Sequence, residues 1–190
     1  MNSLIYKFSL RNGLLIAGIS AVLTIVFYII NPVIQYTNFI VPILTLIIFI
    51  ALLVILAIDV RKKIGGYWTF GEAFISLFIM SICTVVIGLL VNFIMIKLNP
   101  ALPQAINDAV ADLTSKQYEK MGVDQTQIDE ATKRFTNGEF LATLQPTLFN
   151  EIKGLGLGLL IYGVIDLIIA ACIKKTAPLF ISENANETIE

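Results

Sequence analysis

Residues 12–58 read NGLLIAGISAVLTIVFYIINPVIQYTNFIVPILTLIIFIALLVILAI and contain no Asp, Glu, Lys or Arg. A helix needs about 20 apolar residues to cross the ~30 Å hydrocarbon core of a bilayer, so this stretch is too long for a single crossing. It is interrupted at Pro32 and at the polar residues 35–38, which favour a turn. The stretch therefore predicts two membrane helices, residues 12–30 and 39–58, joined by a short uncharged turn.

Two more apolar stretches follow the same pattern. Residues 73–96 end at Lys97, and residues 155–173 end at Lys174. Four such spans predict an all-α fold, an integral membrane four-helix bundle with a helical extracytoplasmic insertion between spans three and four. The expected boundaries are 1–96 for the first three membrane helices, 97–153 for the insertion, 154–175 for the fourth membrane helix and 176–190 for a tail.

The composition agrees with a membrane protein and disfavours other classes. The chain has 190 residues, of which 57% are hydrophobic and 14% charged, and its mean hydropathy is +0.84. Soluble domains carry about 25% charged residues. Thirteen Lys and Arg against 14 Asp and Glu give a net charge of −1, so no global field attracts a nucleic acid. We therefore expect neither a soluble nor a disordered protein, and no nucleic-acid partner.

The chain has no histidine, which removes Ser-His-Asp catalysis, histidine ligands for zinc or haem, and imidazole proton relays. The two cysteines, Cys83 and Cys172, lie far apart inside apolar runs and form no C-x-x-C pair. Carboxylates of the 97–153 segment, such as Asp108 and Glu130, have the spacing of solvated helix faces. We therefore expect a protein that is not an enzyme and has no catalytic, cofactor-binding or metal-binding residue.

The positions of the basic residues predict an orientation, because short loops rich in Lys and Arg remain in the cytoplasm. Three short segments carry such residues, and four crossings place all three on the same side. They are Lys7 and Arg11 before the first span, Arg61, Lys62 and Lys63 after the second, and Lys174 and Lys175 after the fourth. We therefore expect both termini in the cytoplasm and residues 97–153 on the outside.

The 97–153 segment has the composition of a soluble protein and an amphipathic helical pattern. A first helix is expected from Pro103 to about Gly122, and a second begins at Asp124 with a capping box. A short third helix precedes Pro146, and from about Thr147 one helix continues into the fourth span. These helices could lie on the outer membrane surface, cover the bundle or bind a partner.

Asp166 is the one ionisable residue well inside a predicted span, where a carboxylate costs roughly 2.5–3.5 kcal/mol on insertion scales. It must be protonated, paired or in contact with water. Counting residues from the membrane ends puts it level with Ser20 on the first span and with Ser81 and Thr84 on the third. The candidate intramembrane polar site therefore comprises Asp166, Ser20, Ser81, Thr84 and Asn92.

Small and polar residues mark one face on each of the last two spans. On the third span these are Ser81, Thr84, Gly88 and Asn92; on the fourth they are Gly156, Gly163, Asp166 and Ala170, with a G-x-x-x-G at Gly154 and Gly158. Two such faces pack closely and form hydrogen bonds across their interface. The seam is either a packing interface with one bonded Asp166 or a path for protons or cations.

The loop between spans two and three holds the most specific string, DVRKKIGGYWTFGEAF at residues 59–74. Gly65 and Gly66 permit a tight turn with positive φ. Tyr67 and Trp68 suit the membrane interface. Glu72 falls in the first turn of the third span, where the helix dipole favours an acid. Anchoring at the membrane surface accounts for the whole string.

The string also resembles a loop of a four-helix inner-membrane family of Bacteroidota that is catalogued as a domain of unknown function. That family has a basic residue before Gly-Gly-Tyr/Phe and then a Phe-Gly-Glu-Ala-Phe-like run that opens the third span. The counterparts in this chain are Arg61, Gly65, Gly66, Tyr67, Phe70, Gly71, Glu72, Ala73 and Phe74, with Asn99-Pro100 after the span. The resemblance implies a bacterial inner-membrane protein with four spans, and it implies no activity or ligand. In such a protein, the outer side expected for residues 97–153 is the periplasm.

Two hypotheses about function follow. The first is a non-enzymatic structural, accessory or envelope protein in the lipid bilayer, which forms a homo-oligomer or binds a membrane-protein partner through its small-residue seams. The second is a small proton- or cation-linked transporter that uses Asp166. Larger transporters have repeats or paired discontinuous helices, and neither occurs in this sequence. The first hypothesis therefore takes precedence.

Overall fold

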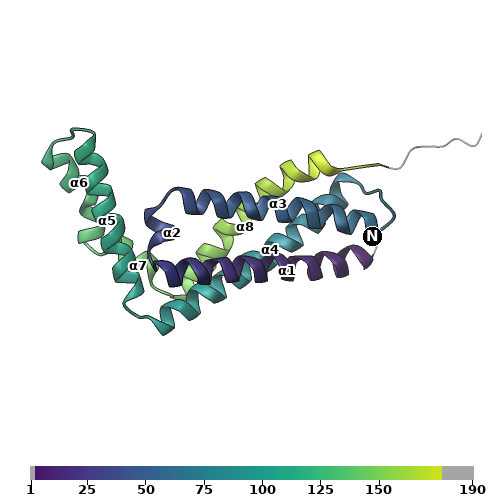
Figure 1. Cartoon of the computed structure of the whole chain (residues 1–190), viewed down its shortest axis with the longest axis horizontal. Helices are drawn as coiled ribbons and strands as arrows, with labels where there is room; N and C mark the ends of the chain where they lie inside the picture. The colour runs from purple at the N-terminus through teal and green to yellow at the C-terminus, as the bar shows by residue number, and fades with distance from the viewer. Residues whose placement is uncertain (1–2, 177–190) are drawn as a thin grey trace, which may run out of the picture.

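The computed structural model of the chain describes residues 3–176, and every regular element in that range is a helix (Figure 1). The helices are α1 (Ser3–Ile30), α2 (Ile34–Thr37), α3 (Ile40–Lys63), α4 (Phe70–Leu98), α5 (Leu102–Lys120), α6 (Gln125–Thr136), α7 (Glu139–Leu144) and α8 (Leu148–Ile173). The class is therefore all-α, as the sequence predicts. The expected tail, residues 176–190, lies outside the described residues except for its first member.

Four helices in the described range, α1, α3, α4 and α8, are long and apolar enough to cross a membrane. Each coincides with one predicted span, and α1, α3 and α4 extend beyond the predicted ends, whereas α8 begins at Leu148, close to the helix start expected at about Thr147. The first, for example, begins at Ser3 and not at residue 12, and the second ends at Lys63 and not at residue 58. The reason is that Lys and Arg are good helix formers, so a charged residue limits the lipid-buried stretch without ending the helix.

The long helices expose much of their apolar surface. Ile29, Ile40 and Leu160 each have 65% or more of their surface accessible, although they lie in helices without a polar face. A water-soluble protein rarely exposes a contiguous apolar surface of this extent, whereas a bilayer covers such a surface with lipid. The exposure pattern is therefore that of helices surrounded by hydrocarbon.

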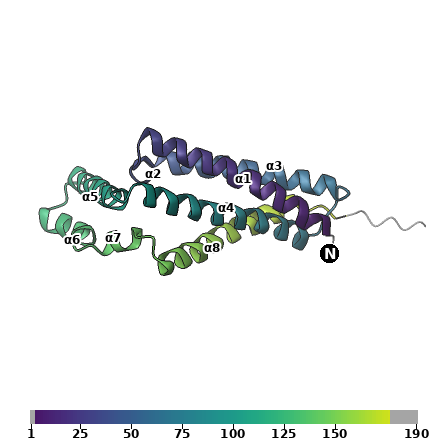
Figure 2. The ribbon, with the colours of Figure 1, turned by 90° about the horizontal axis from the view of Figure 1, so that it is seen from below.

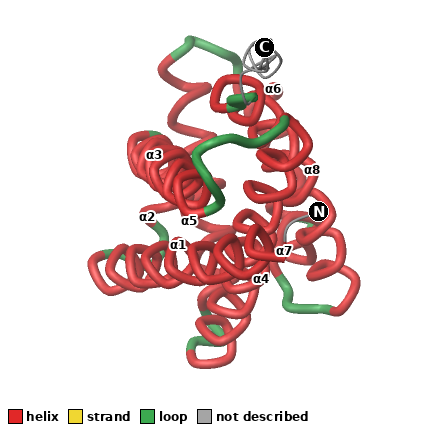
Figure 3. The backbone as a smooth tube through the Cα atoms, turned by 90° about the vertical axis from the view of Figure 1, so that its right-hand side faces the viewer, coloured by secondary structure: helices red, strands yellow, loops and turns green. Residues whose placement is uncertain are grey.

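The long helices run side by side along the longest axis of the molecule, with α4 in contact with each of the other three (Figures 1 and 2). The most extensive contacts join α4 to α1 and to α8. The end-on view shows α3 and α8 in the upper part of the picture, above α1 and α4 (Figure 3). One end of the group, the basic end, carries the N-terminus, the α3–α4 loop and the last turn of α8 (Figure 1). The other is the insertion end, where α2 and α5–α7 lie.

The turn expected between the first two spans contains α2, a single helical turn. The amide side chains on either side stabilise it: Asn31 accepts a hydrogen bond from the Val33 backbone at 3.0 Å, and Asn38 accepts one from Ile40 at 2.8 Å. Such local side-chain bonds are the usual role of asparagine in turns.

The α5–α7 segment follows the predicted boundaries closely. Asp124 accepts a hydrogen bond from the Gln127 backbone at 3.1 Å and so caps α6. Gly122 and Gly138 have φ values of +71° and +81°, which end the preceding helices. Helix α5 contacts α2 and the end of α4, where a cluster of apolar side chains is buried. This cluster is formed by Ile96, Leu102 and Ile106.

Candidate functional site

Polar side chains in the long helices are joined across helix pairs at the basic end. The Ser9 and Ser76 hydroxyls lie 2.7 Å apart and connect α1 to α4. The Asn12 side-chain amide donates to the Leu56 carbonyl and to the Asp59 carboxylate, each at 3.1 Å, and so connects α1 to α3. Hydrogen bonds of this kind contribute on the order of 0.6 kcal/mol each in membrane proteins.

Asp166 forms the equivalent link between α8 and α4. The Ser81 hydroxyl donates to Asp166 Oδ1 at 3.1 Å, and both side chains are fully buried. Asp166 Oδ2 has no hydrogen-bond partner among residues 3–176. Of the three residues that the sequence places level with Asp166, Ser81 is the one that the structure brings into hydrogen-bond contact with it.

Ser20 does not lie at the depth that residue counting assigned to it. A Cβ added at Gly13 would lie 2.9 Å from Met80 Cα, so Gly13 is the α1 residue level with Ser81. Ser20 is about 10 Å further along the helix, because each residue advances it by about 1.5 Å. The count failed because the offset between α1 and α4 is set by contacts between the two helices, such as Ser9 with Ser76, and not by the residues at their ends. Ser20 has no hydrogen bond to Asp166 within the described part of the chain.

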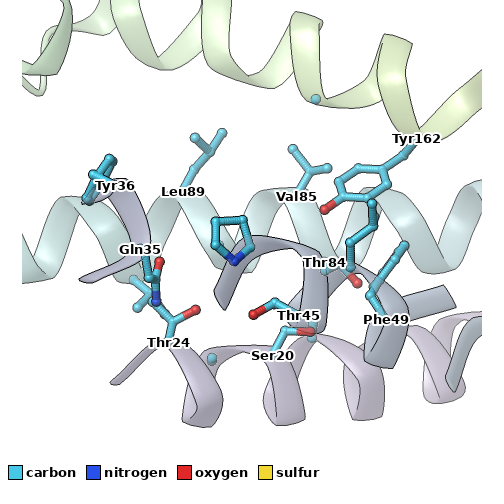
Figure 4. Close-up of a pocket in the computed structure, with 17 residues that line it drawn as sticks. Ser20, Thr24, Gln35, Tyr36, Thr45, Phe49, Thr84, Val85, Leu89 and Tyr162 are labelled. Atoms are coloured by element: carbon cyan, nitrogen blue, oxygen red, sulfur yellow. The ribbon is translucent and has the colours of Figure 1, made fainter. Parts of the chain in front are cut away.

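Ser20 and Thr84 instead line a cleft of about 570 Å³ among the long helices and α2 (Figure 4). The Thr84 hydroxyl donates to the Met80 carbonyl of its own helix at 3.1 Å. Further side chains point into the cleft from α1, α2, α3 and α8. They include Thr24, Gln35, Thr45, Phe49 and Tyr162.

The cleft ends next to the Asp166–Ser81 bond. The rings of Phe49 and Tyr162 pack with centroids 4.7 Å apart and separate the cleft from the basic end. Tyr162 lies one helical turn from Asp166, and Figure 4 shows its hydroxyl directed toward the cleft. Asp166 itself is not part of the cleft lining. The cleft-lining residues Thr84 and Tyr162 lie three and four residues from Ser81 and Asp166 along their helices, so the buried carboxyl is about one helical turn from the cleft lining.

Asn92, the last member of the predicted polar site, lies apart from the others. It lines a smaller cavity of about 170 Å³ together with Asn150 and side chains of α7. Tyr36 and Leu89 line both this cavity and the larger cleft. The predicted site is therefore split into three parts: the Ser81–Asp166 bond, the cleft wall with Ser20 and Thr84, and the cavity with Asn92.

The predicted seam between the third and fourth spans forms only in part. Cβ atoms added at Gly158 and Gly154 would lie 3.2 Å from Val85 and 3.4 Å from Leu89, so the G-x-x-x-G does allow α8 to approach α4. Gly88 and Gly156, in contrast, would meet no atom within 4 Å. The closest approach is that of Gly13, in the first span, to Met80 of α4. It was not predicted, because a single glycine in the sequence does not indicate which residue it will contact.

The α3–α4 loop holds the end of α8. Arg61 Nη1 and Trp68 Nε1 both donate to the Ile173 carbonyl, at 2.9 and 3.0 Å, and the backbones of Trp68 and Lys175 are paired. Trp68 is 2% exposed, so this side chain packs against the protein and has little surface left for lipid headgroups. Tyr67, with 42% of its surface exposed, fits the expected interfacial position.

The remaining residues of the loop motif shape the backbone. Gly65 and Gly66 adopt φ values of +114° and +85°, as the tight turn requires. Thr69 and Glu72 form a reciprocal capping box at the start of α4, which the T-x-x-E spacing in the sequence could have revealed. Phe70 and Gly71 form the first turn of α4 and are exposed.

Comparison with known proteins yields one family. The profile of a family described as "Protein of unknown function (DUF4199)" matches residues 11–175. No curated protein and no solved structure matches the chain. The match extends from the first span to the last residues of the α8 end, and so includes the cleft and the Asp166 site.

Proposed function

The chain belongs to the DUF4199 family, and on that premise we propose that it is a multi-pass bacterial inner-membrane protein with a non-enzymatic structural or accessory role in the envelope. Helices α1, α3, α4 and α8 cross the membrane as a four-helix bundle, and residues 97–153 form a periplasmic insertion. The lipid bilayer is its environment, and a second copy or another membrane protein is its partner.

The orientation is supported by the clustering of positive charge. Lys7 and Arg11 belong to the first turns of α1, Arg61–Lys63 end α3, and Lys175 pairs with Trp68 beside them. All of these cations gather at the basic end, which is therefore the cytoplasmic end under the positive-inside rule.

Alkaline phosphatase fused at Glu130 tests this orientation, because the enzyme is active only outside the cytoplasm. We expect activity at Glu130 and none for a fusion at Lys62 at equal expression. Activity at Lys62 without activity at Glu130 would reverse the orientation.

The proposed structural role rests on one observation: polar side chains within the long helices form hydrogen bonds to neighbouring helices. Ser9 with Ser76, Asn12 with the α3 backbone, and Ser81 with Asp166 each join two different helices. Polar groups committed to helix pairs stabilise a fixed arrangement, as expected of a protein that presents surfaces to partners.

A photoreactive residue incorporated at Leu160 on α8, or at Val22 on α1, tests the partner in native membranes. Both side chains are exposed to the surroundings of the helices. We expect a discrete protein adduct at one position, identified by mass spectrometry as a second copy or another membrane protein. Lipid adducts alone at both positions would contradict an accessory role.

The buried Asp166 Oδ2, which lacks a partner in the described range, favours a second candidate. A proton- or cation-linked transporter would bind its ion at a carboxyl buried within a membrane helix and near a cleft, as Asp166 is. Purified wild type and Asp166→Asn in liposomes, with a pH-sensitive dye, test this. Flux in the wild type that is lost in the variant, at equal folded yield, supports transport. If neither the wild type nor the variant shows flux, the transport hypothesis is wrong.

A further inference from the structure

The cleft among α1, α2, α3, α4 and α8 is too large to be a packing defect. Its volume is about 570 Å³, whereas close-packed protein interiors contain few voids larger than a water molecule. Ligand sites typically occupy about 300–1,000 Å³ and combine an apolar lining with a few polar groups. The cleft has this size and this combination (Figure 4).

The polar groups of the cleft wall are available to a ligand. The hydroxyls of Ser20, Thr24 and Tyr162 have no hydrogen bond to any group within residues 3–176 and therefore offer both a donor and an acceptor. The Thr45 hydroxyl donates to the Val41 carbonyl at 2.8 Å, so its oxygen remains an acceptor, and Thr84 is bonded in the same way. These groups come from four different helices and face a shared space.

The wall carries no charge. Among the described residues, no Asp, Glu, Lys or Arg lines the cleft. A charged ligand group would therefore lose its hydration without gaining an ionic partner, which is costly in an apolar environment. Hydroxyl, ester or carbonyl oxygens, in contrast, find matching partners on the wall.

The cleft opens sideways at the insertion-end half of the helices. Phe49 and Tyr162 pack against each other at one end of it, and α3 and α8 share few contacts over their whole length. Leu46 and Pro42 of α3 line the cleft and are exposed to the surroundings, so the cleft is open on the α3 side. Hydrocarbon could therefore pass between α3 and α8 into the surrounding bilayer while the polar end of the molecule stays inside.

From these features we propose that the cleft binds an uncharged amphiphile from the bilayer. Its hydroxyl or carbonyl head contacts Ser20, Thr45 and Tyr162, and its hydrocarbon tail leaves between α3 and α8. This site requires only that the long helices span a bilayer, and it holds for either orientation and whether or not the protein has an accessory role.

The test uses a photoactivatable diacylglycerol as probe, with the full chain in phosphatidylcholine nanodiscs. Diacylglycerol has an uncharged head with one hydroxyl and two ester carbonyls. We expect labelling of cleft-lining peptides that unlabelled diacylglycerol competes away and that phosphatidylglycerol, which is anionic, does not. Equal competition by the two lipids would show that any lipid occupies the cleft and would overturn the proposal.

Gly88→Leu and Gly156→Leu form a matched pair for the same experiment. Both glycines lie on long helices and an added Cβ meets no atom within 4 Å, but only Gly88 lines the cleft. Gly88→Leu should reduce specific labelling about tenfold, the equivalent of about 1.4 kcal/mol, and Gly156→Leu should leave it unchanged. Wild-type labelling in Gly88→Leu, or the same loss in both, would contradict the site.

Tyr162→Phe keeps the ring that packs on Phe49 and removes only the hydroxyl. A lost hydrogen bond of about 1 kcal/mol predicts about fivefold weaker competition by diacylglycerol. If competition is unchanged in this variant and in Ser20→Ala, the head does not bind where proposed. Because neither substitution changes helix packing, a folded protein is expected in both cases.

Discussion

The two halves of the long helices have similar composition but different packing. In the basic-end half, Gly13 lies so close to α4 that an added Cβ would be 2.9 Å from Met80 Cα. In the insertion-end half, Gly88 would meet nothing within 4 Å and faces the cleft. In the first half serine, asparagine and aspartate are bonded across helix pairs, while in the second the hydroxyls of Ser20 and Tyr162 face a cleft.

This difference teaches that apolar composition brings helices into the membrane but does not determine how closely they pack. Association of helices in lipid depends on close contact and interhelical hydrogen bonds, because lipid tails are as apolar as the side chains themselves. Helices approach closely where a small residue lies opposite a neighbouring helix, as at Gly13, and the cleft stays open where a small residue meets no neighbour, as at Gly88. The following predictions test whether the two halves really differ in this way.

The largest effect is expected at Trp68, which closes the basic end. Trp68→Ala removes a buried aromatic side chain and the hydrogen bond to the Ile173 carbonyl, so the free energy of unfolding should fall by about 3 kcal/mol or more. Unfolding in mixed micelles with increasing SDS measures the change. Tyr67→Ala is the control, since that neighbour is exposed and should cost far less. Equal losses would mean that the loop does not hold α8.

The next effect concerns the close approach of α1 and α4. Gly13→Leu forces a side chain against the Met80 backbone, which cannot move as a flexible side chain would, and overpacking of this kind costs about 1–3 kcal/mol. The same SDS titration measures it. Gly18→Leu is the control on the same helix, because an added Cβ there meets nothing within 4 Å. Unchanged stability of Gly13→Leu would remove the basis for calling this half closed.

A smaller effect is expected where the two halves meet. Ser81→Ala removes the only hydrogen bond that Asp166 receives in the described range and should destabilise the fold by about 1 kcal/mol. Thr84→Val is the control, since that hydroxyl is bonded only to its own helix. Equal effects of the two substitutions in SDS unfolding would indicate that the Ser81–Asp166 bond does not contribute to stability.

Much of the fold was predictable because it depends on local rules. The absence of charge located the four long helices, and Asp124, Gly122 and Gly138 marked helix ends through side-chain and backbone geometry that operates within a few residues. Ser81 was one of three residues expected at the level of Asp166, and it is the one that bonds to it, because consecutive long helices that run in opposite directions meet near their middles.

The features that could not be predicted depend on how distant segments align. Ser20 was assigned to the wrong depth because the offset between α1 and α4 is set by contacts such as Ser9 with Ser76, which no local pattern encodes. Trp68 follows the composition of an interfacial residue, but its burial depends on the last turn of α8. The cleft likewise depends on how few contacts α3 and α8 share, and no local pattern in the sequence indicates this.

The smallest change in stability is expected for a substitution at Gly88. This substitution tests most directly whether the insertion-end half is loosely packed. An added side chain meets no neighbour there, and replacing glycine inside a helix gains up to about 1 kcal/mol of helix propensity. Gly88→Leu should therefore unfold in SDS at the wild-type concentration or slightly above it, in contrast to Gly13→Leu. A loss as large as that of Gly13→Leu would mean that α4 is closely packed along its whole length, because only a neighbour in contact with Gly88 could produce it.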